Sequence, residues 1–227
     1  MTVKLSDVKS PADLRRMSLA ELKALAKEIR EKIVETVAAN GGHLASSLGV
    51  VELTLALHTV FDTPQDKIVW DVGHQSYAHK LVTGRYDRFS TLRKFGGLSG
   101  FPKRQESPYD VYDTGHASGS ISFALGLAKA RDLRGGDENI VVVIGDGALT
   151  SGVAFEGLNN AGEHRTRLIV ILNDNSMSIS ENVGGISYYL TTLRMAPLYR
   201  STKARFEKVL RTMPNLGTRA VNLLKRL

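Results

Sequence analysis

Along the first forty residues, apolar side chains return at the spacing of one helix face. They stand three or four positions apart, at Leu22, Ala26, Ile29, Ile33 and Val37. This spacing predicts an amphipathic helix. Residues 18–21 (Ser-Leu-Ala-Glu) match the capping box that begins many helices, and residues 40–42 (Asn-Gly-Gly) are expected to end this one. A second helical pattern covers residues 50–60.

From residue 67 onward, short apolar runs alternate with helical patterns. Strands are predicted over residues 67–72, 139–144 and 167–172, and helices over residues 120–133 and 151–161. The second and third strands are rich in β-branched residues without polar alternation, which is typical of strands buried on both faces. A strand, a helix and a strand in direct succession form a βαβ unit. The expected fold class is therefore α/β, with a mostly parallel sheet flanked by helices.

Glycine, histidine and charge divide the chain into three parts. Twenty of the 21 glycines and all six histidines lie between Gly41 and Gly185. We predict a helical lead-in over residues 1–40, an α/β domain over residues 41–186, and a basic helical tail or connecting segment over residues 187–227. The net charge of +7 comes mostly from residues 201–227, which hold seven Lys or Arg and one Glu. We therefore expect no basic groove across the main domain and no nucleic-acid partner.

Several classes of protein are excluded by what the sequence lacks. Without cysteine, the chain has no disulfide framework, thiolate metal site or thiol nucleophile. The N-terminal residues have no apolar core of a signal peptide. Apolar runs such as residues 140–144 are far shorter than the ~20 residues of a membrane helix. We expect a cytoplasmic protein with no membrane partner.

The clearest chemical signal follows the second and third predicted strands. Residues 145–147 (Gly-Asp-Gly) and 173–175 (Asn-Asp-Asn) are separated by 25 residues and stand at the carboxyl ends of parallel strands, where such sheets bind ligands. Asp146 can offer a carboxylate and Asn175 an amide oxygen to Mg²⁺, which takes one or two protein oxygens besides phosphate and water. The small residues 147–148 leave backbone N–H groups open to a phosphate. The spacing predicts a magnesium-bound diphosphate.

Four histidines stand beside glycine or in glycine-bounded segments. They are His43, His74, His79 and His116. We expect them to share a polar pocket, because several fall at predicted strand ends or loops. Their spacing does not match a zinc motif. The other two, His58 on an apolar helical segment and His164 in a predicted surface loop, are expected to be structural.

Other interpretations of the glycine motifs fit less well. Gly145-x-Gly147 is followed by four residues before Gly152, where a Rossmann motif has two, and the sequence contains no P-loop. Residues 115–120 (Gly-His-Ala-Ser-Gly-Ser) lack the nucleophile elbow of serine hydrolases. As a small-residue loop before a helix, this segment is a second place where backbone amides can meet a phosphate.

Together these motifs resemble a known family. The paired Gly-Asp-Gly and Asn-Asp-Asn motifs are similar to the thiamine diphosphate signature of transketolase-like enzymes. Longer segments resemble the N-terminal part of the 1-deoxy-D-xylulose-5-phosphate synthases, and the resemblance extends from about residue 11 to residue 227. These segments are GGHLASSLGVVELTLALH, WDVGHQSYAHKLVTGR, GGLSGFPKRQES, GHASGSIS, VVVIGDGALTSG and ILNDNSMSISENVG. The resemblance implies a thiamine diphosphate-binding, transketolase-like N-terminal domain that is incomplete in this chain.

The resemblance also implies an activity and a set of site residues. The family condenses pyruvate with glyceraldehyde 3-phosphate on thiamine diphosphate and Mg²⁺, releasing CO₂ and forming 1-deoxy-D-xylulose 5-phosphate for isoprenoid, thiamine and pyridoxal synthesis. The implied magnesium ligands are Asp146, Asn175 and the Met177 carbonyl. The implied cofactor contacts are His74, Gly115, His116, Ala117, Gly147, Ala148 and Asn175. The implied catalytic residues are His43 and His74, which would face the reacting carbon and pass protons or orient the pyruvate carboxylate.

The chain departs from this family at two positions and in length. Gly119 replaces the usual threonine and Ser176 the usual glutamate, and either change is expected to weaken cofactor binding or local rigidity. The resemblance implies that this chain lacks the domain that holds the aminopyrimidine and supplies the activating glutamate. We therefore expect this chain to supply the diphosphate–magnesium half of a site and to be inactive alone. The missing domains would come in cis or on a partner chain, and the complete enzyme would be a homodimer.

Two alternatives stay open from the sequence. The chain could be a non-catalytic, truncated relic or an interaction subunit, since it lacks part of the site. It could also be a transketolase-type subunit with a different donor substrate, because transketolases share the paired motifs.

Overall fold

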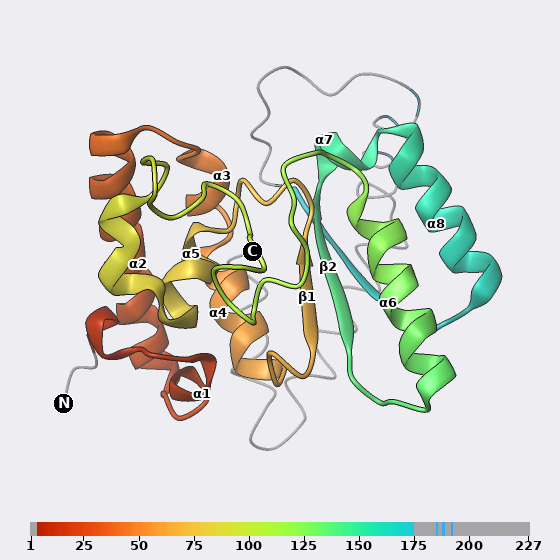
Figure 1. Ribbon diagram of the computed structural model, residues 1–227, viewed down its shortest axis with the longest axis horizontal. Coiled ribbons are helices and arrows are strands. Elements are labelled where there is room, and N and C mark those ends of the chain that lie inside the picture. The colour runs from red at the N-terminus through yellow and green to blue at the C-terminus, as the bar shows by residue number, and fades with distance from the viewer. Residues whose placement is uncertain (1–3, 175–184, 186–187, 189–191, 193–227) are drawn as a thin grey trace. The chain divides into compact units, whose positions relative to one another are not determined.

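The computed structural model describes residues 4–174 together with residues 185, 188 and 192. The chain divides into two compact units, Met1–Ile179 and Ser180–Leu227, and residues 4–174 belong to the first (Figure 1). The predicted magnesium ligands Asn175 and Met177, the departure at Ser176 and nearly all of the predicted basic tail lie outside the described residues. The domain boundaries expected at residues 40 and 186 stay predictions.

A parallel sheet of three described strands forms the centre of the first unit. The strands β1 (Lys67–Trp70), β2 (Ile140–Gly145) and β3 (Ile169–Asn173) lie in the order β1-β2-β3. All pairings are parallel, with Val142 opposite Val69 on one side and Val170 on the other. The prediction of an α/β fold with a parallel sheet is confirmed.

The burial of the strands follows their position in the sheet. The central strand β2 is buried from Ile140 to Ile144, as its unbroken apolar run predicts. The expectation of a fully buried third strand is wrong, because β3 is an edge strand of the described sheet. Two of its side chains, Ile169 and Leu172, are 37% and 39% exposed. An apolar run has the same appearance in the sequence whether its strand has one neighbour or two.

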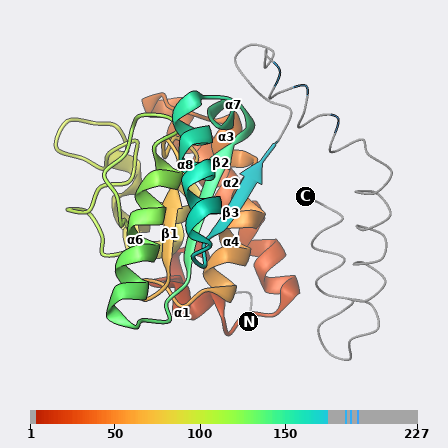
Figure 2. The same cartoon turned by 90° about the vertical axis from the view of Figure 1, so that its right-hand side faces the viewer.

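Two helices cover one face of the sheet (Figure 2). They are α6 (Ser120–Arg134) and α8 (Gly152–His164), and the short helix α7 (Asp146–Leu149) follows β2 directly. Helix α6 ends before Gly135, whose left-handed φ of 69° suits glycine. Helix α8 begins after Ser151, whose hydroxyl accepts a hydrogen bond from the backbone N–H of Val153. His164 is the last residue of α8, so its predicted place in a loop is wrong.

The opposite face carries the N-terminal helices (Figures 1 and 2). Helix α4 (Val51–Val60) packs Leu57 on Trp70 and Val143 of the sheet. The long helix α2 (Leu19–Asn40) begins with the predicted capping box and ends before Gly41. The remaining short elements are η1 (Leu5–Asp7), α1 (Pro11–Leu14), α3 (Ala45–Leu48), α5 (Tyr77–Lys80), η2 (Leu81–Arg85) and η3 (Tyr86–Thr91). None of the described helices combines the length and the apolar character that a membrane crossing requires.

The N-terminal helices share one apolar core. Leu25, Ile29 and Ile33 of α2 pack in the same cluster as Val51 of α4 and Tyr77 of α5. The period of three and four residues that predicted α2 therefore marks the face turned toward these helices. Because α5 lies close behind the end of β1 in the chain, this core also supports the segment that follows that strand.

Candidate functional site

A buried aspartate connects the end of β1 to the loop before α6. Asp71 directly follows β1 and is 1% exposed. Its two carboxylate oxygens accept the Ser118 N–H, each at 2.9 Å. One of them also accepts the N–H of Ser120 at 3.3 Å and the Ser120 hydroxyl at 2.6 Å. Since Ser120 is the first residue of α6, Asp71 holds the start of this helix against the carboxyl end of β1.

The same loop is attached to the segment after β2. The Ser118 hydroxyl donates a hydrogen bond to the Ala148 carbonyl at 2.8 Å. Ser118 has a φ of 77°, which is uncommon for a residue other than glycine, and its bonds to Asp71 and Ala148 stabilise this conformation. Neither Asp71 nor Ser118 was predicted as a site residue, although an aspartate near the end of the strand predicted over residues 67–72 was an available signal.

These bonds bring the two predicted phosphate-binding segments together. Gly115, His116 and Ala117 are exposed on the loop that Asp71 anchors, and Gly147 is exposed on the segment after β2. A Cβ built on Gly115 would meet no atom within 4 Å, so the backbone there is open to a ligand. The structure therefore places the small-residue segments side by side at the carboxyl edge of the sheet.

The predicted metal ligand Asp146 lies at this edge. It is the first residue of α7 and directly follows β2. Gly145 is in register with Asn173 at the end of β3, so Asp146 and Asp174 leave neighbouring strands at the same level. Within the described part of the chain, no three His, Asp or Glu side chains are grouped closely enough to hold a metal ion. An ion that takes one or two protein oxygens, as Mg²⁺ does, does not require such a group.

Two of the predicted histidines form a pair beside this edge. The ring centroids of His43 and His74 are 5.5 Å apart, with the planes at 75°. The backbone N–H of His43 donates to the Tyr77 hydroxyl at 3.3 Å. The Ser47 hydroxyl donates to the His74 carbonyl at 3.1 Å. One side chain of helix α5 and one of helix α3 thus bind the backbone of the two histidines.

The surroundings of the pair favour neutral imidazoles. Burial lowers the pKa of His43, and the positive charge of Arg93 lowers it further. Burial also lowers the pKa of His74, with a second contribution from His43, while the Asp71 carboxylate opposes the change. A neutral imidazole has one nitrogen that donates and one that accepts a hydrogen bond. Both rings are therefore neutral near neutral pH, and each has one nitrogen that can accept a hydrogen bond.

The prediction that all four histidines share one pocket is wrong for His79. Its Nδ1 lies 2.8 Å from Nε2 of His58, and its Nε2 lies 2.8 Å from Oδ1 of Asp110. His79 belongs to the short helix α5 and is fully buried. His58, expected to be structural, is indeed buried and hydrogen-bonded, while His116 is exposed.

Gly73 is the point at which three segments meet. Its φ is 84°, and a Cβ built there would lie 2.3 Å from Pro102 Cδ and 2.7 Å from Thr114 Cγ2. Any other residue would push these segments apart. The close approach brings the loop around Pro102 and the loop that leads to α6 against His74, the next residue in the chain.

Buried polar atoms without a partner gather in the segments around Gly73. Within the described residues, no hydrogen bond reaches Nδ1 of His43, Nδ1 of His74, Oε1 of Gln75 or Oγ1 of Thr114. A buried polar atom left unpaired costs about 1–3 kcal/mol. Four such atoms in neighbouring segments fit a site that receives a polar ligand.

The departure at Gly119 is compatible with the packing of this loop. Its φ is −82°, and a Cβ built there would meet only the Tyr112 hydroxyl, at 3.8 Å. The backbone and the available space would therefore accept the threonine that is usual in the family, and nothing in the structure explains the glycine.

The described residues form an α/β fold with a parallel sheet, a class of protein in which ligands bind at the carboxyl ends of the strands. The family model described as 1-deoxy-D-xylulose-5-phosphate synthase matches residues 5–227, and the chain belongs to this family. The resemblance inferred from the motifs is thereby confirmed.

Relatives named 1-deoxy-D-xylulose-5-phosphate synthase match along almost the whole chain. The one from Syntrophomonas wolfei is 60% identical over 94% of this chain and 33% of its own length. The one from Clostridium kluyveri is 57% identical over 98% of this chain and 36% of its own length. The one from Syntrophotalea carbinolica is 61% identical over 94% of this chain and 34% of its own length. The chain therefore spans about a third of the length of the curated relatives it matches.

Proposed function

We propose that this chain supplies the diphosphate-binding half of the active site of a 1-deoxy-D-xylulose-5-phosphate synthase. This transferase joins pyruvate to glyceraldehyde 3-phosphate with loss of CO₂, using thiamine diphosphate and Mg²⁺. The carrying observation is that Asp71 and Ser118 join two small-residue segments into one exposed backbone surface beside Asp146. Membership of the synthase family supports the choice of cofactor and substrates.

The residues of this edge suit a bound diphosphate. Backbone N–H groups of the two small-residue segments would donate to its oxygens, since a loop that leads into a helix directs such groups outward. The contributing residues in this proposal are Gly115, His116, Ala117, Gly147 and Ala148. Mg²⁺ would take the Asp146 carboxylate, the Asn175 amide oxygen and the Met177 carbonyl, and would neutralise the phosphate charge. When bound, thiamine diphosphate supplies the carbon nucleophile for the reaction.

The histidine pair suits proton transfer beside that cofactor. His43 and His74 are held 5.5 Å apart by neighbouring helices, and the Nδ1 atoms of both rings are buried without a hydrogen bond among the described residues. In the proposed mechanism His74 contacts the cofactor, and the two rings orient the pyruvate carboxylate and hold or release a proton at their ring nitrogens. Since burial lowers both pKa values, the rings would act mainly as acceptors at neutral pH.

The remaining part of the site would come from further protein. The curated relatives are about three times as long as this chain, so we propose that the pyrimidine half of the cofactor is held by domains in cis or on a partner chain. In the complete enzyme we propose a cytoplasmic homodimer that serves isoprenoid and thiamine synthesis.

The proposal is tested with Asp146→Ala in the complete enzyme, obtained by joining this chain to the remaining two thirds of the Syntrophomonas wolfei relative. Magnesium-dependent binding of thiamine diphosphate, measured by titration calorimetry, is expected to weaken at least about tenfold, since a ligand that contributes more than about 1.4 kcal/mol is lost. The matched control is Asp137→Ala, an exposed aspartate before the opposite end of β2. Unchanged binding in Asp146→Ala would contradict the magnesium assignment.

The same enzyme separates the alternatives. Product from pyruvate and glyceraldehyde 3-phosphate would support the synthase. Turnover only with a ketose phosphate as donor would indicate a transketolase-type enzyme. A folded assembly in which thiamine diphosphate and Mg²⁺ do not bind would indicate a non-catalytic role.

A further inference from the structure

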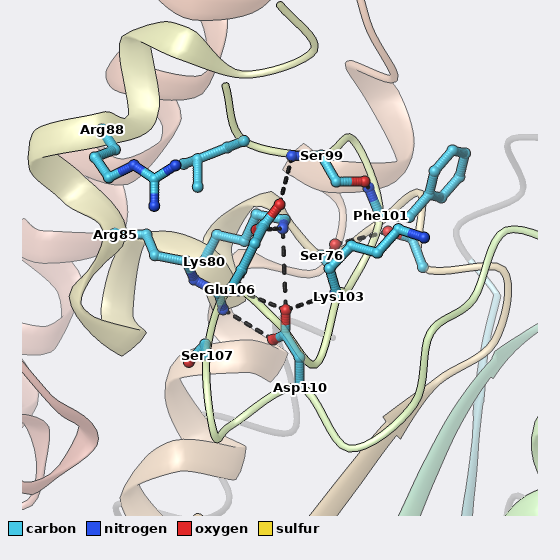
Figure 3. A network of polar contacts seen from close by, with 12 residues as sticks. Ser76, Lys80, Arg85, Arg88, Ser99, Phe101, Lys103, Glu106, Ser107 and Asp110 are labelled. Atoms are coloured by element: carbon cyan, nitrogen blue, oxygen red, sulfur yellow. Dashed lines mark hydrogen bonds and ion pairs between the residues drawn. The ribbon is translucent and has the colours of Figure 1, made fainter. Parts of the chain in front are cut away.

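A buried network of ion pairs surrounds Asp110 (Figure 3). Lys80 Nζ is 2.5 Å from Glu106 Oε2 and 4.0 Å from Asp110 Oδ2. Arg85 donates to both oxygens of Asp110, at 2.6 and 3.0 Å. The side chains of Lys80 and Asp110 are fully buried. Two cations and two carboxylates are thus enclosed together, and His79 adds a further hydrogen bond to Asp110.

The two carboxylates of this network hold one loop on both sides of Phe101. Glu106 Oε1 accepts the backbone N–H of Ser99 at 2.6 Å. Asp110 Oδ2 accepts the backbone N–H of Lys103 at 2.8 Å. Between them, the Phe101 N–H donates to the Ser99 hydroxyl at 3.1 Å. Figure 3 shows the Phe101 ring pointing away from the ion pairs, outward from the loop that they hold.

The held loop lies against the histidine pair. The ring centroid of Phe101 is 6.0 Å from that of His43, and Pro102 packs on Gly73, which precedes His74. Helix α5 contacts both the histidine pair and the ion-pair network, since the Tyr77 hydroxyl accepts the His43 N–H and Lys80 binds Glu106. The ion pairs, the loop and the histidines therefore form one connected structure.

The stability of the fold alone does not explain such a network. Enclosing ions costs solvation energy that their attraction only partly returns, so well-packed apolar residues in their place are often as stable. The ions add geometric specificity, because each carboxylate oxygen accepts a hydrogen bond only from a backbone N–H placed in a defined position. That property matters most where a loop must be placed within a fraction of an ångström.

We propose that Glu106 and Asp110 are positioning residues, whose ion pairs with Lys80 and Arg85 set the loop 99–103 so that Phe101 packs on His43. Through Phe101 they determine the orientation of the His43 ring and its access to water. The inference rests on the proposed function, in which the His43–His74 pair faces the substrate. The charged and polar groups that face His43 are His74, Arg93 and the Tyr77 hydroxyl, and all are retained in the variants below.

The test is a pH titration of the histidine ring signals by NMR in the 227-residue chain. In Phe101→Ala and in Glu106→Ala, water gains access to the ring, and the pKa of His43 is expected to rise toward its ordinary value of about 6.5. Glu106→Gln keeps an oxygen for the Ser99 N–H but loses the ion pair with Lys80, so the pKa of His43 is expected to rise less than in Glu106→Ala. The control is Glu138→Ala. Glu138 is a buried carboxylate that pairs with Arg134 and lies just before the first residue of β2, at the end of the strand away from the candidate site.

The outcomes separate positioning from simple support. If Glu106→Ala lowers the unfolding midpoint but leaves the His43 titration and the Phe101–His43 proton contacts unchanged, the network is structural only and the proposal is overturned. If Glu106→Ala does not fold, Phe101→Ala decides, since an unchanged His43 titration in that variant overturns the proposal as well. The measurement needs no cofactor, so it succeeds or fails independently of thiamine diphosphate binding.

Discussion

Replacing Asp71 tests most directly how the loop before α6 is held. In Asp71→Ala, two backbone N–H groups and one hydroxyl lose their acceptor, at Ser118 and Ser120, which are almost fully buried. The hydroxyl can rotate to another partner, so the two N–H groups determine the cost. A buried donor without an acceptor costs about 1–3 kcal/mol. Because the Ser120 N–H bond is long, at 3.3 Å, we expect a loss of about 3 kcal/mol in the free energy of unfolding.

The asparagine variant refines this estimate. Asp71→Asn keeps one oxygen for the Ser118 N–H, and its new N–H₂ group can donate to the Ser120 hydroxyl. Only the Ser120 N–H then lacks an acceptor, so the expected loss is about 1–2 kcal/mol. Both losses are smaller than the roughly 5–15 kcal/mol of a typical domain, so both variants are expected to fold.

The chain carries its own probe for this measurement. The single tryptophan, Trp70, is buried at the end of β1 beside Asp71, so its fluorescence reports urea unfolding. Amide hydrogen exchange at Ser118 and Ser120 is expected to accelerate more than exchange in β2. The exposed Asp137→Ala variant is the control. A loss below about 1 kcal/mol in Asp71→Ala, together with unchanged exchange at Ser118, would refute the reasoning.

Two further predictions concern the dependence of stability on pH and the replacement of Gly73. Burial lowers the pKa of His58 and His79, so the unfolded chain takes up protons first, and the urea midpoint is expected to fall as the pH decreases below about 6.5. Although burial alone would raise the pKa of Asp110, hydrogen bonds from His79 and a buried arginine lower it. Protonation of Asp110 is therefore expected to lower the urea midpoint further below about pH 4. A constant midpoint between pH 7 and pH 5 would contradict the histidine contribution. Gly73→Ala combines a left-handed φ with a 2.3 Å approach and is expected to lower stability by about 3 kcal/mol in a denaturation assay. The control is Gly126→Ala inside α6, where an added Cβ meets nothing within 4 Å. This variant is expected to raise the free energy of unfolding by a few tenths of a kcal/mol or more. Equal midpoints for the two glycine variants would show that the crowding at Gly73 is relieved by small shifts.

Much of the fold follows from local sequence. The helix α2 could be predicted because its capping box, its apolar period and its terminal glycine are all signals between residues a few positions apart. The strand β2 could be predicted from an apolar run between polar residues. The order strand, helix, strand then implied parallel pairing, and parallel pairing placed the motifs at one edge of the sheet.

The sequence by itself therefore determined the class of fold, the family and the segments that compose the candidate site. Only the tertiary structure decided which side chains within those segments meet. His74 and His79 are five residues apart, yet one lies beside His43 and the other is buried against Asp110. Asp71 reaches a serine 47 positions later, and β3 is partly exposed where its composition suggested burial. Periodicity shows which side of an element is apolar, whereas the partner on that side depends on contacts between segments far apart in the chain.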